Sequence, residues 1–175
     1  MQRSKMIIDV EYFSLSEISD NRGNFIKLYS SKWDLAQSTN LEESFITTSL
    51  KGTTRGMHLQ IGDSANLKIV SVISGEIFDV LVDLRPKSKT FRSINQVRLT
   101  AGNTFIIPPG VAHGFQSIEE SKVLYLSNKS HDPILDQGFD VKSVPIEWPL
   151  DFNIQSSRDK SLPTLENFIK GLNLA

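Results

Sequence analysis

The stretch "GNTFIIPPGVAHGFQS", residues 102–117, decides the fold. Gly102, Pro108, Gly110 and His113 follow one another in it at the spacing Gly-x5-Pro-x-Gly-x2-His. Glycine adopts turn conformations that are closed to other residues, and proline sets φ where a strand leaves its ladder. We therefore expect strands joined by tight turns here, with His113 pointing from a strand into the mouth of a barrel.

Short runs of alternating hydrophobicity extend this pattern along the chain. The expected strands are 24–29, 43–50, 67–75, 76–84, 93–100, 103–109 and 121–128. Glycine bounds two hairpin regions, 52–75 and 102–118, which we expect to pair as halves of one barrel. Helices are expected at 30–39 and at 162–172. This many short strands at such spacing indicates a sandwich or a barrel.

Composition bounds the class of protein. A length of 175 residues with 39% hydrophobic residues predicts a single domain over 1–175. The formal net charge of −1 leaves no broad basic field, so we expect no nucleic acid partner and no membrane association. The absence of cysteine excludes disulfides, thiolate catalysis and cysteine-ligated metals. Without a secretion signal or a long apolar run, the expected location is cytoplasmic.

A second stretch, "TTRGMHLQIGDSANLKIV" at 53–70, carries groups suited to proton transfer. A neutral histidine such as His58 is a suitable general base near neutral pH. The ammonium group of Lys68 can stabilise the negative charge that develops on a carbonyl oxygen when the neighbouring C–H is deprotonated. Tyr125, on an opposite wall, can return a proton to the other face and so invert the carbon. Taken singly, each residue is more often a packing or surface residue.

The spacing from Gly102 to His113 resembles the second motif of the cupin superfamily, a double-stranded β-helix or jelly roll. Metal-dependent cupins carry His-x-His and a glutamate in their first motif, where this chain has "MHLQ" with His58 alone. The chain has 3 histidines, and a stable metal site normally needs three or four well-placed ligands. We therefore expect an all-β, cupin-type jelly-roll barrel with short terminal helices and no metal.

The chain also resembles the dTDP-4-dehydrorhamnose 3,5-epimerase family, in the same order and across most of its length. The matching stretches are "DNRGNF" (20–25), "KGTTRGMHLQ" (51–60), "LKIVSVISGEIFDVLVDLRPKSKTF" (67–91), "IIPPGVAHGF" (106–115), "VLYLSN" (123–128), "IEWP" (146–149) and "SSRDKSLPTL" (156–165). This match is specific for the family and less specific for one substrate, because related members act on other 4-keto sugar nucleotides.

The resemblance implies four catalytic positions. His58 falls on the catalytic base of the family, and Asp159 on the carboxylate that orients its imidazole. Lys68 falls on the lysine that holds the C4 keto oxygen of the sugar and the enolate derived from it. Tyr125 falls on the tyrosine acid. These roles agree with the chemistry expected of the residue types, and the reaction needs no cofactor.

The resemblance also implies positions that bind substrate. Arg55 falls on an arginine that contacts the phosphates, and His113 on a pocket histidine near the sugar. Arg22 falls on an arginine at the nucleotide side, which in the family can come from the partner subunit of a dimer. Asp79 and Asp83 lie four positions apart, so the alternation of a strand with period two places them on one face, and we expect them to support the pocket.

Several positions depart from the family pattern. Glu43 and Phe45 stand where the family usually has glutamine and asparagine, and Ser130 and His131 stand where paired aromatic residues are common. Asp136 replaces a glutamate, and we expect it to bind substrate. Because these positions are associated with nucleotide and sugar contacts, the nucleotide stays open, as does the choice of C3, C5 or both for inversion.

The expected function is therefore epimerisation of a nucleotide-linked 4-keto-6-deoxy sugar, dTDP-linked or carried by another nucleotide, in deoxysugar or polysaccharide biosynthesis. The expected assembly is a homodimer. One alternative is a cupin-type ketoisomerase, although that group tends to carry an extra histidine where this chain has Gln60. Another is a non-catalytic sugar-nucleotide-binding cupin, which would keep the barrel and lose the base or the acid. Metal-dependent oxygenase chemistry is disfavoured by the missing His-x-His.

Overall fold

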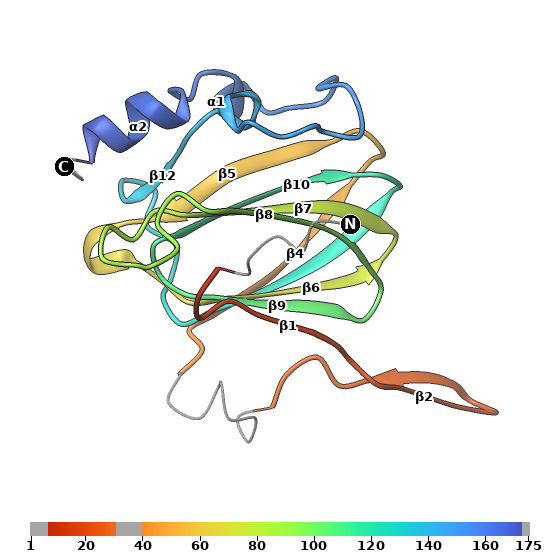
Figure 1. Ribbon diagram of the computed structural model, residues 1–175. Coiled ribbons are helices and arrows are strands. Elements are labelled where there is room, and N and C mark those ends of the chain that lie inside the picture. Colours follow the sequence, from red (N-terminus) through yellow and green to blue (C-terminus); the bar gives the residue numbers. More distant parts are fainter. Residues whose placement is uncertain (1–6, 31–39, 173–175) are drawn as a thin grey trace.

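Two antiparallel sheets of five strands each face one another in the computed structural model, which describes residues 7–30 and 40–172 (Figure 1). In strand order, the first sheet comprises β1 (Glu11–Ser14), β9 (Asn103–Ile107), β6 (Lys68–Ser74), β11 (Ser121–Ser127) and β4 (Glu43–Ser49). The second comprises β12 (Asp136–Gly138), β5 (Thr54–Gln60), β10 (Val111–Ser117), β7 (Glu76–Asp83) and β8 (Ile94–Thr100). The predicted all-β jelly-roll class is confirmed.

Smaller elements complete the fold. A hairpin of β2 (Glu17–Asp20) and β3 (Gly23–Ile26) projects away from the two sheets (Figure 1). The remaining elements are the 3-10 turns η2 (Gly62–Ser64) and η3 (Val141–Ser143) and the helices α1 (Ser157–Lys160) and α2 (Leu165–Gly171). The helix expected at 162–172 is thus confirmed as α2. The helix expected at 30–39 falls, but for its first residue, outside the described residues.

The regions 52–75 and 102–118 do pair with each other, and they do so twice. Strand β5 pairs with β10 in the second sheet, and β6 pairs with β9 in the first. The description of each region as a hairpin is wrong, because its two strands lie in different sheets. Each region instead carries the chain across from one sheet to the other, which is how a jelly roll differs from a meander of hairpins.

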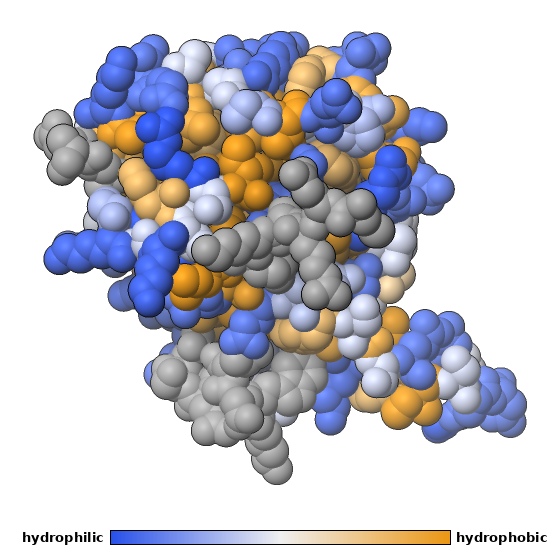
Figure 2. Space-filling model, in the orientation of Figure 1, coloured by the Kyte–Doolittle hydropathy of each residue, from blue (hydrophilic) through white to orange (hydrophobic). Residues whose placement is uncertain are grey.

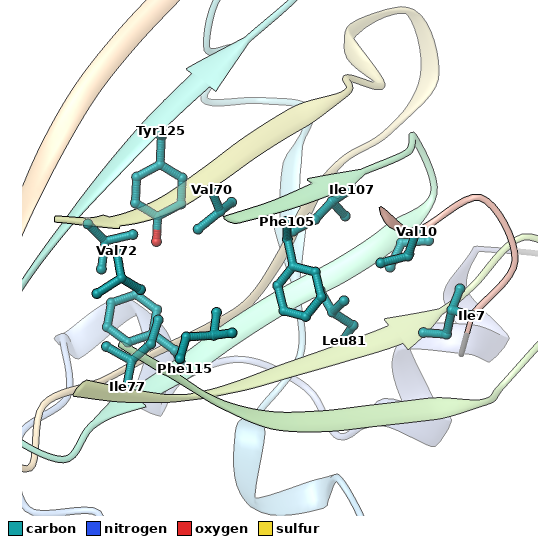
Figure 3. Close-up of a cluster of buried hydrophobic side chains, with 13 residues drawn as sticks. Ile7, Val10, Val70, Val72, Ile77, Leu81, Phe105, Ile107, Phe115 and Tyr125 are labelled. Carbon is teal, nitrogen blue, oxygen red and sulfur yellow. The ribbon is translucent and has the colours of Figure 1, made fainter. Parts of the chain in front are cut away.

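The main hydrophobic core lies between the sheets (Figure 3). A second one lies behind the second sheet. Strand β7 serves both, because successive side chains point to opposite faces. Its Ile77 and Leu81 face the first core, while Val80 and Val82 face the second. Residues of α2 cover the second core at the spacing of one helix face, namely Leu165, Phe168 and Ile169.

Candidate active site

A cavity of about 830 Å³ opens between the sheets, and seven of the eight predicted site residues line it. These are Arg55, His58, Lys68, His113, Tyr125, Asp136 and Asp159. The eighth, Arg22, lies in the turn of the β2–β3 hairpin, where its exposed side chain pairs with Asp20. It does not line the cavity of its own chain. The fold therefore gathers these seven residues from five strands and from α1 into one site.

A β-bulge brings Arg55 and His58 to the same wall. His58 lies opposite His113 and Arg55 opposite Phe115, so three steps along β5 match two along β10. In a regular strand, residues three apart point to opposite faces. The extra residue shifts this pattern, and a bulge commonly re-aims side chains in this way. As a result, the side chains of Arg55 and His58 both face the cavity, while Met57 packs into the second core.

Two glycines allow the strands to meet at this bulge. A Cβ on Gly56 would lie 2.5 Å from the Cα of Gly114, and Gly56 has a φ of +108°. A Cβ on Gly114 would lie 2.6 Å from the sulfur of Met57. Both positions therefore need glycine, one for conformation and close approach and the other for close approach. Gly56, two residues before His58, and Gly114, directly after His113, thus serve to place these histidines.

His58 forms a dyad with Asp159 from the far end of the chain. The Nε2 atom of His58 lies 2.9 Å from Oδ1 of Asp159. Asp159 is held in α1, where the Ser156 hydroxyl caps the helix by accepting the Asp159 N–H at 3.0 Å. Burial raises the pKa of the Asp159 carboxyl, but hydrogen bonds, chiefly from His58, bring that pKa below its ordinary value. The ionised carboxylate thus fixes the proton on Nε2 and leaves Nδ1 as the basic nitrogen.

Lys68 and Tyr125 belong to the opposite sheet. Tyr125 pairs with Val70, two residues from Lys68, so both side chains share the inner face. Burial lowers the pKa of Lys68, and the charge of Asp136 partly opposes this effect. Among the described residues, the Lys68 ammonium has no hydrogen-bond acceptor. A partly buried and unpaired ammonium in the cavity wall is poised to receive an anionic oxygen from a ligand.

Tyr125 is held in its neutral form. Burial, and then the negative charge of Asp79, raise the pKa of its phenol above the ordinary value. Its ring meets that of His113 edge-on, with the ring centres 6.1 Å apart. In Figure 3 its hydroxyl points away from its own strand and into the space between the sheets. Tyr125 is therefore available as a proton donor on the wall facing His58.

The two aspartates of β7 have different environments. Oδ2 of Asp79 lies 2.7 Å from Nε2 of His113, so Asp79 supports the pocket as expected. Asp83 lies outside the cavity wall, and there the expectation of a pocket role is wrong. It instead binds Arg85, Ser88 and Thr90 in the connection to β8. Burial alone would raise the pKa of Asp83, but these hydrogen bonds lower it to about 2.

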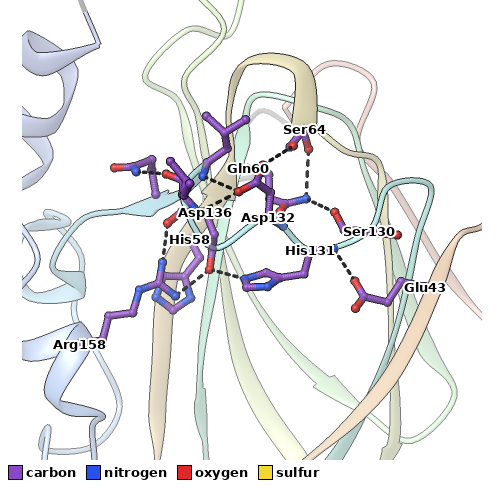
Figure 4. Close-up of polar contacts among 12 residues, drawn as sticks. Glu43, His58, Gln60, Ser64, Ser130, His131, Asp132, Asp136 and Arg158 are labelled. Carbon is purple, nitrogen blue, oxygen red and sulfur yellow. Dashed lines mark hydrogen bonds and ion pairs between the residues drawn. The ribbon is translucent and has the colours of Figure 1, made fainter.

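A charged cluster at the cavity wall includes Arg158, which the sequence analysis missed. Oδ2 of Asp136 accepts hydrogen bonds from Arg158 at 2.7 Å and from His131 at 3.1 Å (Figure 4). Burial raises the pKa of Asp136, and these two donors bring it below the ordinary value. Arg158 directly precedes Asp159 in "SRDK". This position next to a predicted catalytic residue could have identified Arg158 as a site residue from the sequence.

Hydrogen bonds anchor the segment that carries His131. Gln60 accepts the backbone N–H of Asp132 at 2.6 Å and donates to the carbonyl oxygens of Ser64 and Ser130 (Figure 4). Glu43 accepts the N–H of His131 at 3.0 Å. Gln60 thus has a local structural role on the strand of His58, two residues further along the same wall.

Comparison with known proteins identifies the family. The family model described as dTDP-4-dehydrorhamnose 3,5-epimerase matches residues 4–167. The chain belongs to this family. It is 36% identical over 175 residues to the dTDP-4-dehydrorhamnose 3,5-epimerase of Methanothermobacter thermautotrophicus, covering 93% of this chain and 90% of that protein. It is 33% identical over 162 residues to the Shigella flexneri enzyme of the same name, covering 87% and 89%.

Solved structures of the family share the fold. One of them is the dTDP-6-deoxy-D-glucose-3,5-epimerase of Legionella pneumophila in complex with dTDP-4-keto-L-rhamnose. It matches this epimerase-family chain with a TM-score of 0.85 and 28% identity, covering 93% of this chain and 91% of that one. The family relationship therefore holds in sequence and in structure.

Two further features of this family member bear on what it can bind. Within residues 7–30 and 40–172, no three histidine or acidic side chains come together in a way that could hold a metal ion. The helices of the same part of the chain are too short and too polar to cross a membrane. The side chains that line the cavity include imidazole, ammonium, guanidinium, phenol and carboxylate groups.

Proposed function

We propose that the protein inverts C3, C5 or both of a dTDP-linked 4-keto-6-deoxy sugar in deoxysugar biosynthesis. One observation carries the proposal: a histidine–aspartate base and a neutral tyrosine lie on opposite walls of one cavity, with an unpaired ammonium on the wall of the tyrosine. An enzyme that inverts a carbon beside a ketone needs a base on one face, an acid on the other and a stabilised enolate.

The reaction balances without an added reactant. Nδ1 of His58 takes the proton from the carbon next to the C4 ketone, and Asp159 stabilises the resulting imidazolium. The C–H electron pair moves into the enolate, whose oxygen accepts a hydrogen bond from the Lys68 ammonium. Tyr125 then delivers its proton to the opposite face of that carbon. Proton exchange with water restores His58 and Tyr125 to their starting forms.

The charged groups at the cavity suit a nucleotide diphosphate. Arg55 is held by the Ser49 hydroxyl at 2.9 Å and the Thr48 carbonyl at 3.3 Å, and it retains further donors for a phosphate. In the proposed complex, Arg55 binds the diphosphate while His113 and Asp136 contact the sugar. Support for dTDP comes from the names of the relatives, because the described contacts do not distinguish one base from another.

A homodimer is part of the proposal. The β2–β3 hairpin that carries Arg22 also exposes Ile18 and Phe25, which are directly paired. Figure 2 shows hydrophobic surface on this projecting hairpin. Exposed apolar side chains on a projecting hairpin favour contact with another surface. In such a dimer, Arg22 would reach the nucleotide in the partner's cavity. The cytoplasmic location stays a prediction.

The deciding experiment is NMR of the protein in D2O with 4-keto-6-deoxy sugars linked to dTDP, CDP or GDP. Deuterium at C3, C5 or both identifies the carbon and the preferred nucleotide, and a changed coupling pattern identifies inversion. Migration of the carbonyl to C3 would favour the ketoisomerase. Absence of exchange with a folded protein that still binds the nucleotide sugar would favour the binding module.

A further inference from the structure

Phe45 stacks on the proposed acid. It lies on β4 directly opposite Tyr125 on β11, and the two rings are nearly parallel, with an angle of 11° and centres 4.8 Å apart. Directly opposite side chains on neighbouring strands are the closest cross-strand pairs in a sheet. Both residues line the same cavity. Phe45 therefore touches the acid at the place where substrate is expected to bind.

The position of Phe45 in the sheet makes it the outer neighbour of Tyr125. A row of directly paired residues crosses all five strands of the first sheet: Phe45, Tyr125, Val70, Phe105 and Tyr12. Val70 is fully buried and supports Tyr125 from one side. On the other side β4 is the edge strand, so Phe45 alone supports the phenol within this row.

Exposure differs sharply within the pair. Phe45 is 46% exposed, whereas Tyr125 is only 9% exposed. Phe45 thus covers the tyrosine on the solvent side. A smaller side chain at this position would open the edge of the sheet to water and give the phenol ring room to change rotamer.

We propose that Phe45 is a positioning residue that holds the Tyr125 phenol in the orientation for delivering its proton. Phe45 thereby determines the fraction of enolates that become inverted product instead of returning to the starting configuration. This inference rests on the proposed epimerase function and adds a residue and a measurable property to it. Small misplacements of a reacting group lower rates steeply, by about 100-fold for roughly 1 Å.

The two steps of the proposed reaction make the effect separable. Removal of the C–H proton by His58 lets deuterium enter from D2O whether or not the tyrosine acts. Inversion needs the proton of Tyr125 as well. The ratio of inversion to exchange therefore reports the tyrosine step alone, and a general loss of folding or of substrate binding lowers both quantities together.

The test compares Phe45→Leu with Phe45→Tyr, Ile46→Ala and Tyr125→Phe. Leucine keeps an apolar side chain but removes the ring, while tyrosine keeps the ring and should rescue the stack. Ile46 is the exposed neighbour on the same strand, paired with Leu124 and facing the other side of the sheet. Exchange and inversion are followed by NMR in D2O with the carrier that the unmodified protein accepts, after circular dichroism has confirmed folding.

We expect Phe45→Leu to lower inversion per exchange event at least about tenfold, toward the value of Tyr125→Phe, because a positioned acid contributes about 10²–10⁴-fold. In Phe45→Tyr and Ile46→Ala, the ratio of inversion to exchange should stay within about twofold of the value for the unmodified protein, because the acid keeps its position. Equal losses of exchange and inversion in Phe45→Leu, or no change in their ratio, would overturn the positioning role. Failure of the unmodified protein to exchange at all would instead overturn the proposed function, and the inference with it.

Discussion

His58 and His113 lie directly opposite each other on β5 and β10, and each is hydrogen-bonded to its own aspartate. Their accessibility differs: the His58 side chain is 25% exposed, while that of His113 is 5% exposed. A base must reach its substrate, so this difference favours His58 as the residue that removes the proton. His113, held by buried Asp79, is better placed to shape the wall beside Tyr125.

His58→Ala should abolish deuterium incorporation, with a loss of about 10²–10⁴-fold, because the variant lacks the general base. Asp159→Asn keeps the imidazole but removes the charge that fixes its tautomer, so we expect a smaller loss. NMR in D2O measures both. Equal exchange in His58→Ala and the unmodified protein would exclude His58 as the base.

Tyr125→Phe should separate the two halves of the reaction. The variant keeps the base and the ammonium, so deuterium should still enter the substrate. It lacks the proton donor on the opposite wall, so net inversion should fall by about 10²–10⁴-fold. Integration of the exchanged substrate and of the inverted product checks this result, and undiminished inversion would assign the acid to another group.

Lys68→Met should lower activity and raise stability. Loss of the enolate's cationic partner should slow exchange by about 10²–10³-fold. Stability should rise because a partly buried, unpaired ammonium disfavours the folded state. The lowered pKa of Lys68 means that the unfolded chain binds more protons below the ordinary lysine pKa. Between the lowered pKa of the folded protein and the ordinary lysine pKa, Lys68 therefore makes stability increase with pH. The Lys68→Met variant should lack this pH dependence.

Urea unfolding at several pH values measures the Lys68 effect, with Lys122→Met as the matched control. Lys122 lies on the neighbouring strand β11 and is exposed. Its replacement should change stability by less than about 0.5 kcal/mol. A destabilised Lys68→Met protein would contradict the assignment of an unpaired charge in the cavity wall.

Asp83→Asn should reduce stability at neutral pH by roughly 2–3 kcal/mol, since the folded-state pKa of about 2 lies well below the unfolded value. A lowered carboxyl pKa stabilises the fold above the unfolded pKa, and this contribution is lost as pH falls toward 2. The difference between variant and unmodified protein should therefore narrow below about pH 4. Asp63→Asn, on an exposed turn, serves as the control and should show no such narrowing.

Gly56→Ala should destabilise the protein by more than about 2 kcal/mol, because the new Cβ meets backbone atoms of β10 that cannot easily move. Gly171→Ala is the matched control. It lies in α2 with no atom within 4 Å of the added Cβ, so stability should be unchanged or rise by up to about 1 kcal/mol. Thermal unfolding distinguishes the two variants, and a tolerated Gly56→Ala would refute the close approach at the bulge.

The fold and much of the site were accessible from the sequence for local reasons. Alternating hydrophobicity along residues 76–84 and turn residues around Pro108 are properties of neighbouring residues, so they predict strands and their ends. The chemistry of His58, Lys68 and Tyr125 follows from their side chains. Their grouping into one site came from the family resemblance, because periodicity alone leaves each of them with an ordinary packing or surface role.

Contacts between distant parts of the chain decided the remaining features of the fold and of the site. The sequence by itself determined the strand-rich class, the residue types for proton transfer and the glycines near the two histidines. Only the tertiary structure decided that β5 carries a bulge, that α1 places Asp159 beside His58 from 101 positions away, and that Phe45 stacks on Tyr125. The physical reason is that strand register and long-range packing depend on which surfaces meet, and no local pattern of residues specifies that choice.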